Sequence, residues 1–224
     1  MIEIIENAIQ LITTGLCTVI AARKGILLRS RAWIVLALAS GVFFLGDLYW
    51  ELFLVLYGHT PGYSYIPYLS WYASYLFLLL LLVELKGTQK SGKKRKILWI
   101  IPVFSAGMCV FYMQYGDWIG NIITAVFMSL LMWHALDMLL SLKDSQKASS
   151  GMNSEMSGTV SERGHGKAAI FAVVFLFCIV EYAAWTATCF GDYETLAHPY
   201  FWLDTLLSAV FLLFPAALGK AVGR

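Results

Sequence analysis

Apolar runs of about 20 residues alternate with short polar segments along the whole chain. A helix needs about 20 mostly apolar residues to cross the hydrocarbon core of a bilayer, so each run predicts a membrane-spanning helix. We predict an all-α membrane protein of seven such helices in a single domain, residues 1–224. The approximate bounds of the predicted spans are 4–22, 32–57, 65–85, 97–115, 118–142, 168–190 and 200–219.

Positive charges occupy only every second connection between these spans. All 16 Lys and Arg residues lie within residues 23–31, 86–96, 143–167 and 220–224. Cytoplasmic loops of membrane proteins carry an excess of Lys and Arg. We therefore place these segments in the cytoplasm, with the N-terminus outside and the C-terminus inside. We expect a multi-pass protein of the bacterial inner (plasma) membrane.

The composition agrees with a membrane protein. Hydrophobic residues make up 59% of the chain and charged residues 13%, whereas about a quarter of an ordinary soluble domain is charged. The net charge of +2 averages over two ends of opposite sign. Basic loops that face anionic lipid headgroups are expected of such a protein. We therefore expect the lipid bilayer as a partner and no nucleic acid.

The longest connection between the predicted spans covers residues 144–167. It is rich in Ser, Gly and Met and shows no apolar periodicity. This composition predicts a flexible cytoplasmic loop that acts as a tether.

An internal repeat relates spans 2 and 3 to spans 6 and 7. Each pair contains an acidic residue among aromatics, a turn, a proline followed by an aromatic residue, and a leucine-rich end. Asp47 precedes Pro67 by 20 residues, and Glu181 precedes Pro199 by 18. Both pairs run in the same direction across the membrane. We therefore predict two three-helix units joined by span 4, a 3+1+3 parallel repeat of the kind found in some transporters.

Predicted spans 2, 6 and 7 carry acidic side chains in the half nearest the exterior. Charged side chains inside a bilayer are unfavourable, and where they persist they mark function or pairing. Asp47 and Glu51 lie four residues apart on one face of span 2, with Trp50 beside them. Glu181 lies at a similar depth in span 6, and Asp204 lies about one turn below the exterior surface in span 7.

Aromatic side chains accompany these carboxyl groups. Trp185 follows Glu181 by about one turn, and span 3 places Tyr72 and Tyr75 at a matching depth. No Lys or Arg is expected on this side of the membrane to neutralise the carboxylates. Two explanations remain open: some of the carboxyl groups are protonated, or a cation occupies the site. Aromatic faces with carboxylates suit an organic ammonium ligand, and they also suit a proton-coupled site.

A simpler interpretation needs no ligand. Carboxyl groups near the interface can hydrogen-bond to Tyr and Ser side chains or reach the headgroups, which applies above all to Asp204 and Glu51. We nevertheless predict one ligand-binding pocket. Its residues are Asp47, Trp50, Glu51, Tyr72, Tyr75, Glu181, Trp185 and Asp204.

A second polar pair lies in the inner half of span 5. His134 and Asp137 are three residues apart and share a helix face. The pair is interpreted either as a proton relay or as a local hydrogen bond between the two side chains. A single intramembrane His cannot supply a bis-His haem site, and we predict no metal site.

The acidic and aromatic motifs resemble those of the seven-helix integral-membrane sensory domains that precede bacterial diguanylate cyclase modules. The matching elements are Gly46-Asp47-Leu48-Tyr49-Trp50, Gly58-His59-Thr60-Pro61, Glu181 and Leu203-Asp204-Thr205-Leu206. The chain departs from that pattern at Tyr68, where an Asp is expected, and at Leu207 or Ser208, where a Trp is expected. No cyclase module follows Arg224, so the resemblance implies a small-molecule sensory module that acts with a separate cytoplasmic signalling partner.

Three functions are compatible with this sequence. We favour a sensor or receptor subunit that binds a small cationic or protonatable ligand in an outward-facing pocket. A small-solute or proton-coupled transporter is the second, since parallel repeats permit alternating access. A lipid hydrolase is the third, since Gly46-Asp47 resembles a Gly-Asp pair on an early span of the small polytopic lysoplasmalogenases. The chain carries no hydrolase, nucleotide-binding or Cys-x-x-Cys motif, so we assign no catalytic residue and no cofactor.

Overall fold

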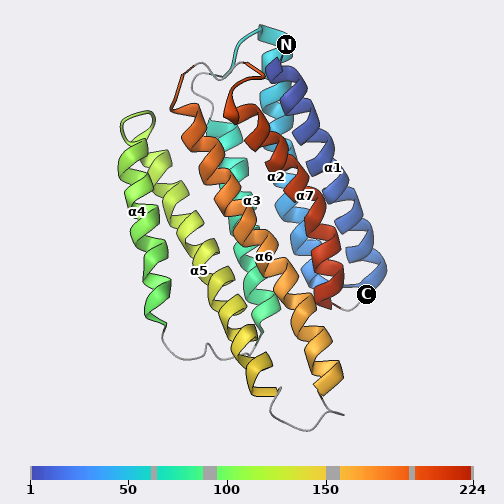
Figure 1. The fold of residues 1–224 in the computed structure, drawn as a ribbon. Helices are drawn as coiled ribbons and strands as arrows, with labels where there is room; N and C mark the ends of the chain where they lie inside the picture. Colours follow the sequence, from blue (N-terminus) through green and yellow to red (C-terminus); the bar gives the residue numbers. More distant parts are fainter. Residues whose placement is uncertain (1, 62–64, 88–94, 150–156, 192–194, 223–224) are drawn as a thin grey trace.

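The computed structural model describes residues 2–61, 65–87, 95–149, 157–191 and 195–222, and every regular element among them is helical (Figure 1). In chain order the elements are α1 (Ile2–Leu28), α2 (Arg31–Tyr57), α3 (Tyr65–Lys86), the 3₁₀ helix η1 (Lys96–Trp99), α4 (Ile100–Tyr112), α5 (Trp118–Ser149), α6 (Ser157–Thr188) and α7 (Pro199–Val222). The prediction of an all-α protein is therefore confirmed.

Six helices in this part of the chain are long and apolar enough to cross a membrane, namely α1, α2, α3, α5, α6 and α7. The predicted fourth span, residues 97–115, is a shorter apolar helix, Lys96–Tyr112, made of η1 and the 13-residue α4. At a rise of 1.5 Å per residue α4 is about 20 Å long, less than the roughly 30 Å of hydrocarbon in a bilayer. The chain is thus a membrane protein with six helices of spanning length, and a seventh span stays a prediction.

The six long helices form a closed ring. Packing contacts join α1 to α2, α2 to α3, α3 to α5, α5 to α6, α6 to α7, and α7 back to α1. Helix α4 packs on the outside of this ring against α5 (Figure 1). The hydroxyl of Tyr112 in α4 also donates a 2.9 Å hydrogen bond to the backbone carbonyl of Tyr182 in α6. Helix α5 therefore lies between α3 and α4, although α3 and α4 are consecutive long elements in the sequence.

The helices run up and down, so the connections gather at two ends of the bundle (Figure 1). The end that holds the connections after α1, α3 and α5 and the C-terminus of α7 carries the Lys and Arg segments, and we name it the basic end. The opposite end holds the start of α1, with Glu3 and Glu6, and we name it the acidic end. This separation of charge is what the sequence predicts, whereas the orientation in the membrane stays a prediction.

A large aromatic core fills the bundle between its two ends. Phe177 of α6 and Phe211 and Phe214 of α7 are each at most 1% exposed, and their rings contact one another at centroid distances of 5.7–6.1 Å. Phe43 of α2 contacts Phe211 at 4.8 Å. These rings form an aromatic layer beneath the acidic end, which we name the aromatic floor.

Helix occupies both ends of the segment predicted as a flexible loop. Helix α5 continues to Ser149 and α6 begins at Ser157, so of residues 144–167 only 150–156 fall outside the described residues. Near the start of the apolar part of α6, Gly166 packs against the backbone carbonyl of Lys220, and Lys167 Nζ donates a 3.0 Å hydrogen bond to the carbonyl of Leu85. The segment contains no proline, so backbone hydrogen bonding continues the helices past the apolar runs.

Candidate functional site

A cavity of about 340 Å³ lies between α1, α2, α3, α6 and α7 at the acidic end. We name this space the acidic cavity. Its carboxyl and amide side chains are Glu3, Glu6, Asn7, Gln10, Asp47, Glu181 and Asp204. The acidic cavity is also lined by Phe43 and Leu207. Each lies about one turn nearer the basic end than the carboxyl group on its helix, beside the aromatic floor. The structure thus brings together Asp47, Glu181 and Asp204, which come from three different helices.

All three carboxyl groups are buried. Asp47 is 4% exposed, Glu181 6% and Asp204 5%. Each lies about one to three turns from the acidic end of its helix, and the ring of helices turns each side chain inward. These side chains therefore lie inside the bundle and do not extend from its surface.

Hydrogen-bond donors from neighbouring helices hold one oxygen of each carboxyl group. Trp71 Nε1 of α3 donates to Asp47 Oδ1 over 3.1 Å, and Gln10 Nε2 of α1 donates to Asp204 Oδ1 over 3.3 Å. The second oxygens, Asp47 Oδ2 and Asp204 Oδ2, are buried and have no hydrogen-bond partner within the described part of the chain. Each carboxyl group is therefore oriented by one donor, and its second oxygen is buried among the surrounding side chains.

Glu181 is held more completely. Its Oε1 accepts a 2.6 Å hydrogen bond from the hydroxyl of Tyr75 and a 3.2 Å hydrogen bond from Nε1 of Trp185, one turn along α6. Tyr75 is 2% exposed, so this network is removed from solvent. Two donors on one oxygen fix the position of the Glu181 side chain between α3 and α6.

Helix α1 supplies a wall of the acidic cavity that sequence reasoning missed. Glu6 is 3% exposed and Gln10 8%, and both lie with Glu3 and Asn7 on the side of α1 that faces the ring. In the sequence these polar residues lower the mean hydropathy of the first predicted span. The signal that identifies them is their spacing, because positions 3, 6, 7 and 10 recur every three or four residues and so share one helix face.

The charged side chains that line the acidic cavity are all acidic. None of its wall residues in the described part of the chain is Lys or Arg. Trp50, Trp71 and Trp185 add aromatic faces to the wall. No group of three or more His, Cys, Asp or Glu among the described residues is close enough to hold a metal ion. Carboxyl groups beside aromatic faces are a combination that can contact an organic ammonium group.

Three predicted residues lie elsewhere. Glu51 is half-buried and is not in the wall of the acidic cavity. Tyr72 donates a 3.3 Å hydrogen bond to the carbonyl of Gly120 and lines a neighbouring cavity, and Tyr75 acts behind the wall through Glu181. The reason is helix rotation: only part of each helix circumference faces the centre of the ring.

The neighbouring cavity has a volume of about 510 Å³ and lies between α3, α4, α5 and α6. We name it the lateral cavity, and its wall includes Tyr65, Leu69, Tyr72, Ile119, Ile123 and Tyr182. The wall is mostly aromatic and aliphatic. Four residues line both cavities, namely Tyr68, Tyr115, Glu181 and Trp185.

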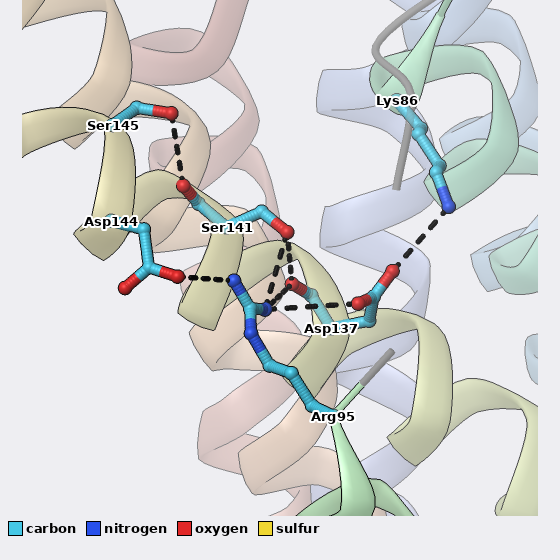
Figure 2. Close-up of polar contacts among 6 residues, drawn as sticks. All are labelled: Lys86, Arg95, Asp137, Ser141, Asp144 and Ser145. Atoms are coloured by element: carbon cyan, nitrogen blue, oxygen red, sulfur yellow. Dashed lines mark hydrogen bonds and ion pairs between the residues drawn. The ribbon is translucent and has the colours of Figure 1, made fainter. Parts of the chain in front are cut away.

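Asp137 lies far from both cavities, in an ion-pair cluster at the basic end (Figure 2). Lys86 Nζ lies 3.5 Å from Asp137 Oδ2, and Arg95 Nη1 lies 3.7 Å from Asp137 Oδ1. Arg95 also pairs with Asp144 at 2.7 Å. Asp137 therefore ties α3 and the segment before η1 to α5. His134 is half-buried one turn away and lines neither cavity, and the proton-relay hypothesis stays untested.

Comparison of the chain with protein-family models, with curated proteins and with solved structures gives no match. The geometry of the two cavities and the six spanning helices therefore carry the functional argument. The resemblance to sensory domains stays a prediction that rests on the motifs around Asp47, Glu181 and Asp204.

Proposed function

We propose that this protein binds a small organic cation in the acidic cavity and acts as a sensor or receptor subunit of the inner membrane. The observation that carries the proposal is that Asp47, Glu181 and Asp204 line one cavity beside tryptophan rings, in a wall that holds no basic residue among those described. Buried carboxylate oxygens without partners are unfavourable. A cationic ligand stabilises them and stacks on the neighbouring tryptophans.

Binding is coupled to the cytoplasmic side through two helical units. In the proposed 3+1+3 repeat, α1, α2 and α3 form one unit and α5, α6 and α7 the other. The two units then meet at two helix pairs, because α1 packs against α7 and α3 packs against α5. A cation between Asp47 of the first unit and Asp204 of the second favours one packing of the two units, which shifts the population of their basic ends.

Tetramethylammonium is the simplest probe of the acidic cavity. Titration calorimetry of the full chain in lipid nanodiscs measures its affinity for the wild type and for Asp47→Asn, which keeps the shape and removes the charge. We expect Asp47→Asn to lower the affinity at least tenfold, because a tenfold change needs only about 1.4 kcal/mol, and two unit charges about 4 Å apart attract by roughly 4 kcal/mol at the effective dielectric constant of a protein. Wild-type protein that does not bind, or an Asp47→Asn variant that binds as tightly as the wild type, would refute the proposed function.

Glu51→Gln is the matched control. The Glu51 carboxyl group neighbours Asn7 and Glu3 of the cavity wall but does not line the cavity, so removal of its charge should lower tetramethylammonium affinity less than Asp47→Asn does. The sensor mechanism has its own readout. With Cys189→Ser to remove the most accessible thiol, spin labels at Arg23→Cys in α1 and Ser145→Cys in α5 report the distance between the two units. We expect that distance to change on saturation with the ligand, and an unchanged distance argues against sensing.

A transporter is the second candidate, since the helix neighbours fit a parallel repeat. The packed rings of Phe43, Phe177 and Phe211 lie on the basic-end side of the cavity, which favours a one-sided binding site. Flux of tetramethylammonium into proteoliposomes separates the two. The Gly-Asp pair that favours a lipid hydrolase has a packing explanation, because a Cβ on Gly46 would lie 3.0 Å from Ser70 Cβ and from Trp71 Nε1.

A further inference from the structure

The acidic and lateral cavities share part of their walls. Glu181 and Trp185 of α6, Tyr68 of α3 and Tyr115, which precedes α5, line both. Tyr75 and Trp185 hold the Glu181 side chain from α3 and α6, so this carboxyl group lies where the two cavities adjoin. A ligand that binds in both cavities would pass beside these four residues.

The two cavities differ in chemistry. The acidic cavity presents buried carboxyl groups, whereas the lateral cavity is lined mainly by aromatic and aliphatic side chains. One further carboxylate, Asp117, lines the lateral cavity, and its oxygens accept hydrogen bonds from the backbone N–H groups of Ile119 and Gly120 at the start of α5. Asp117 therefore caps helix α5. The remaining wall of the lateral cavity suits an apolar part of a ligand.

The lateral cavity reaches the outer surface of the bundle. Leu69 of α3 is 64% exposed, and Ile119 and Ile123 of α5 are 53% and 37% exposed. These apolar side chains lie on spanning helices, so the surface that they expose faces lipid tails in the proposed orientation. The cavity volumes of about 340 and 510 Å³ each fall in the range of small-molecule sites, about 300–1,000 Å³.

We infer that the ligand is a single-chain cationic amphiphile. Its ammonium head lies against Asp47 and Asp204 in the acidic cavity, and its alkyl chain passes Glu181 into the lateral cavity toward lipid. This inference rests on the proposed function, that the acidic cavity binds an organic cation. Burial of each methylene group strengthens binding by about fourfold, so a chain in the lateral cavity raises affinity well above that of the head alone.

The experiment compares two probes of known chemistry, tetramethylammonium and decyltrimethylammonium. Each displaces labelled tetramethylammonium from the full chain in nanodiscs of one lipid composition. Ile123→Trp fills the lateral cavity. Ile122→Trp is the matched control, because Ile122 is the adjacent isoleucine of α5, is 39% exposed against 37% for Ile123, and does not line the cavity. Partition of the probes into lipid is the same for every variant and cancels from the comparison.

We expect Ile123→Trp to reduce the preference for decyltrimethylammonium over tetramethylammonium at least tenfold relative to Ile122→Trp. Its affinity for tetramethylammonium should stay within twofold of the wild type, which also shows that the variant is folded. Equal preferences in the two variants would overturn the amphiphile inference and leave the proposed function standing. Absence of tetramethylammonium binding by the wild type, by contrast, would remove the proposed function on which the inference rests.

Discussion

Removal of the Tyr75 hydroxyl tests how the acidic cavity keeps its shape. Tyr75 is 2% exposed, and its hydroxyl donates to Glu181 Oε1 over 2.6 Å. Tyr75→Phe keeps the ring that packs against Phe127 and Phe177 and deletes only this donor. Loss of a hydrogen bond costs about 1 kcal/mol for a neutral carboxyl group and up to about 3 kcal/mol for an ionised one. We therefore expect a loss of about 1–3 kcal/mol in the free energy of unfolding.

The native cysteines provide the assay. Cys17, Cys109 and Cys178 are buried, so a thiol-reactive fluorescent dye reports their exposure as the purified protein unfolds. For a chain of this length the expected loss lowers the midpoint of thermal unfolding by about 2–12 °C. Tyr72→Phe is the control: its hydroxyl makes a longer bond, 3.3 Å, from a half-buried ring, so the midpoint should fall less. A Tyr75→Phe midpoint equal to that of Tyr72→Phe contradicts the reasoning.

Two further substitutions test the wall that α1 supplies and the cluster at the basic end. Gln10→Leu removes the donor to Asp204 Oδ1, and Asp204 Oδ2 has no donor in the wild type within the described part of the chain. We therefore expect the midpoint of thermal unfolding to fall and the affinity for tetramethylammonium to change. An unaltered affinity would place α1 outside the site. Asp137→Asn breaks the ion pairs with Lys86 and Arg95. It should lower the free energy of unfolding by about 1–3 kcal/mol without a change in ligand affinity. The Asp144 side chain is 68% exposed, so Asp144→Asn should lower the free energy of unfolding by less than about 1 kcal/mol in the same dye assay.

Helix existence and the separation of charge followed from the sequence alone. The apolar runs predict helices because a bilayer leaves the backbone no other way to satisfy its polar groups, and run length sets the span. The fourth run shows the limit of this argument. Residues 97–115 are apolar enough to predict a span, yet the helix within them ends at Tyr112. The depth of Asp47 along its helix was likewise readable from its distance to the ends of its run.

The partners of each carboxyl group were decided only by tertiary structure. Hydropathy along these helices is nearly uniform around the circumference, because lipid tails are as apolar as a protein core. The sequence therefore does not reveal which face turns inward, and it does not predict that Trp71 rather than Tyr72 meets Asp47. It also does not reveal that α1 closes the ring beside α7 and brings Gln10 to Asp204.

The sequence by itself determined that the chain forms long apolar helices, which end of the bundle carries the positive charge, and how far along its helix each acidic residue lies. These properties depend on one-dimensional quantities, the length of a run and the position of a charge within it. The order of the helices in the ring, the place of α4 outside it, and the meeting of Asp47, Glu181 and Asp204 in one cavity depend on helix rotation and side-chain packing. Those are set by contacts between segments far apart in the chain, such as Gln10 and Asp204, so only the folded structure shows them.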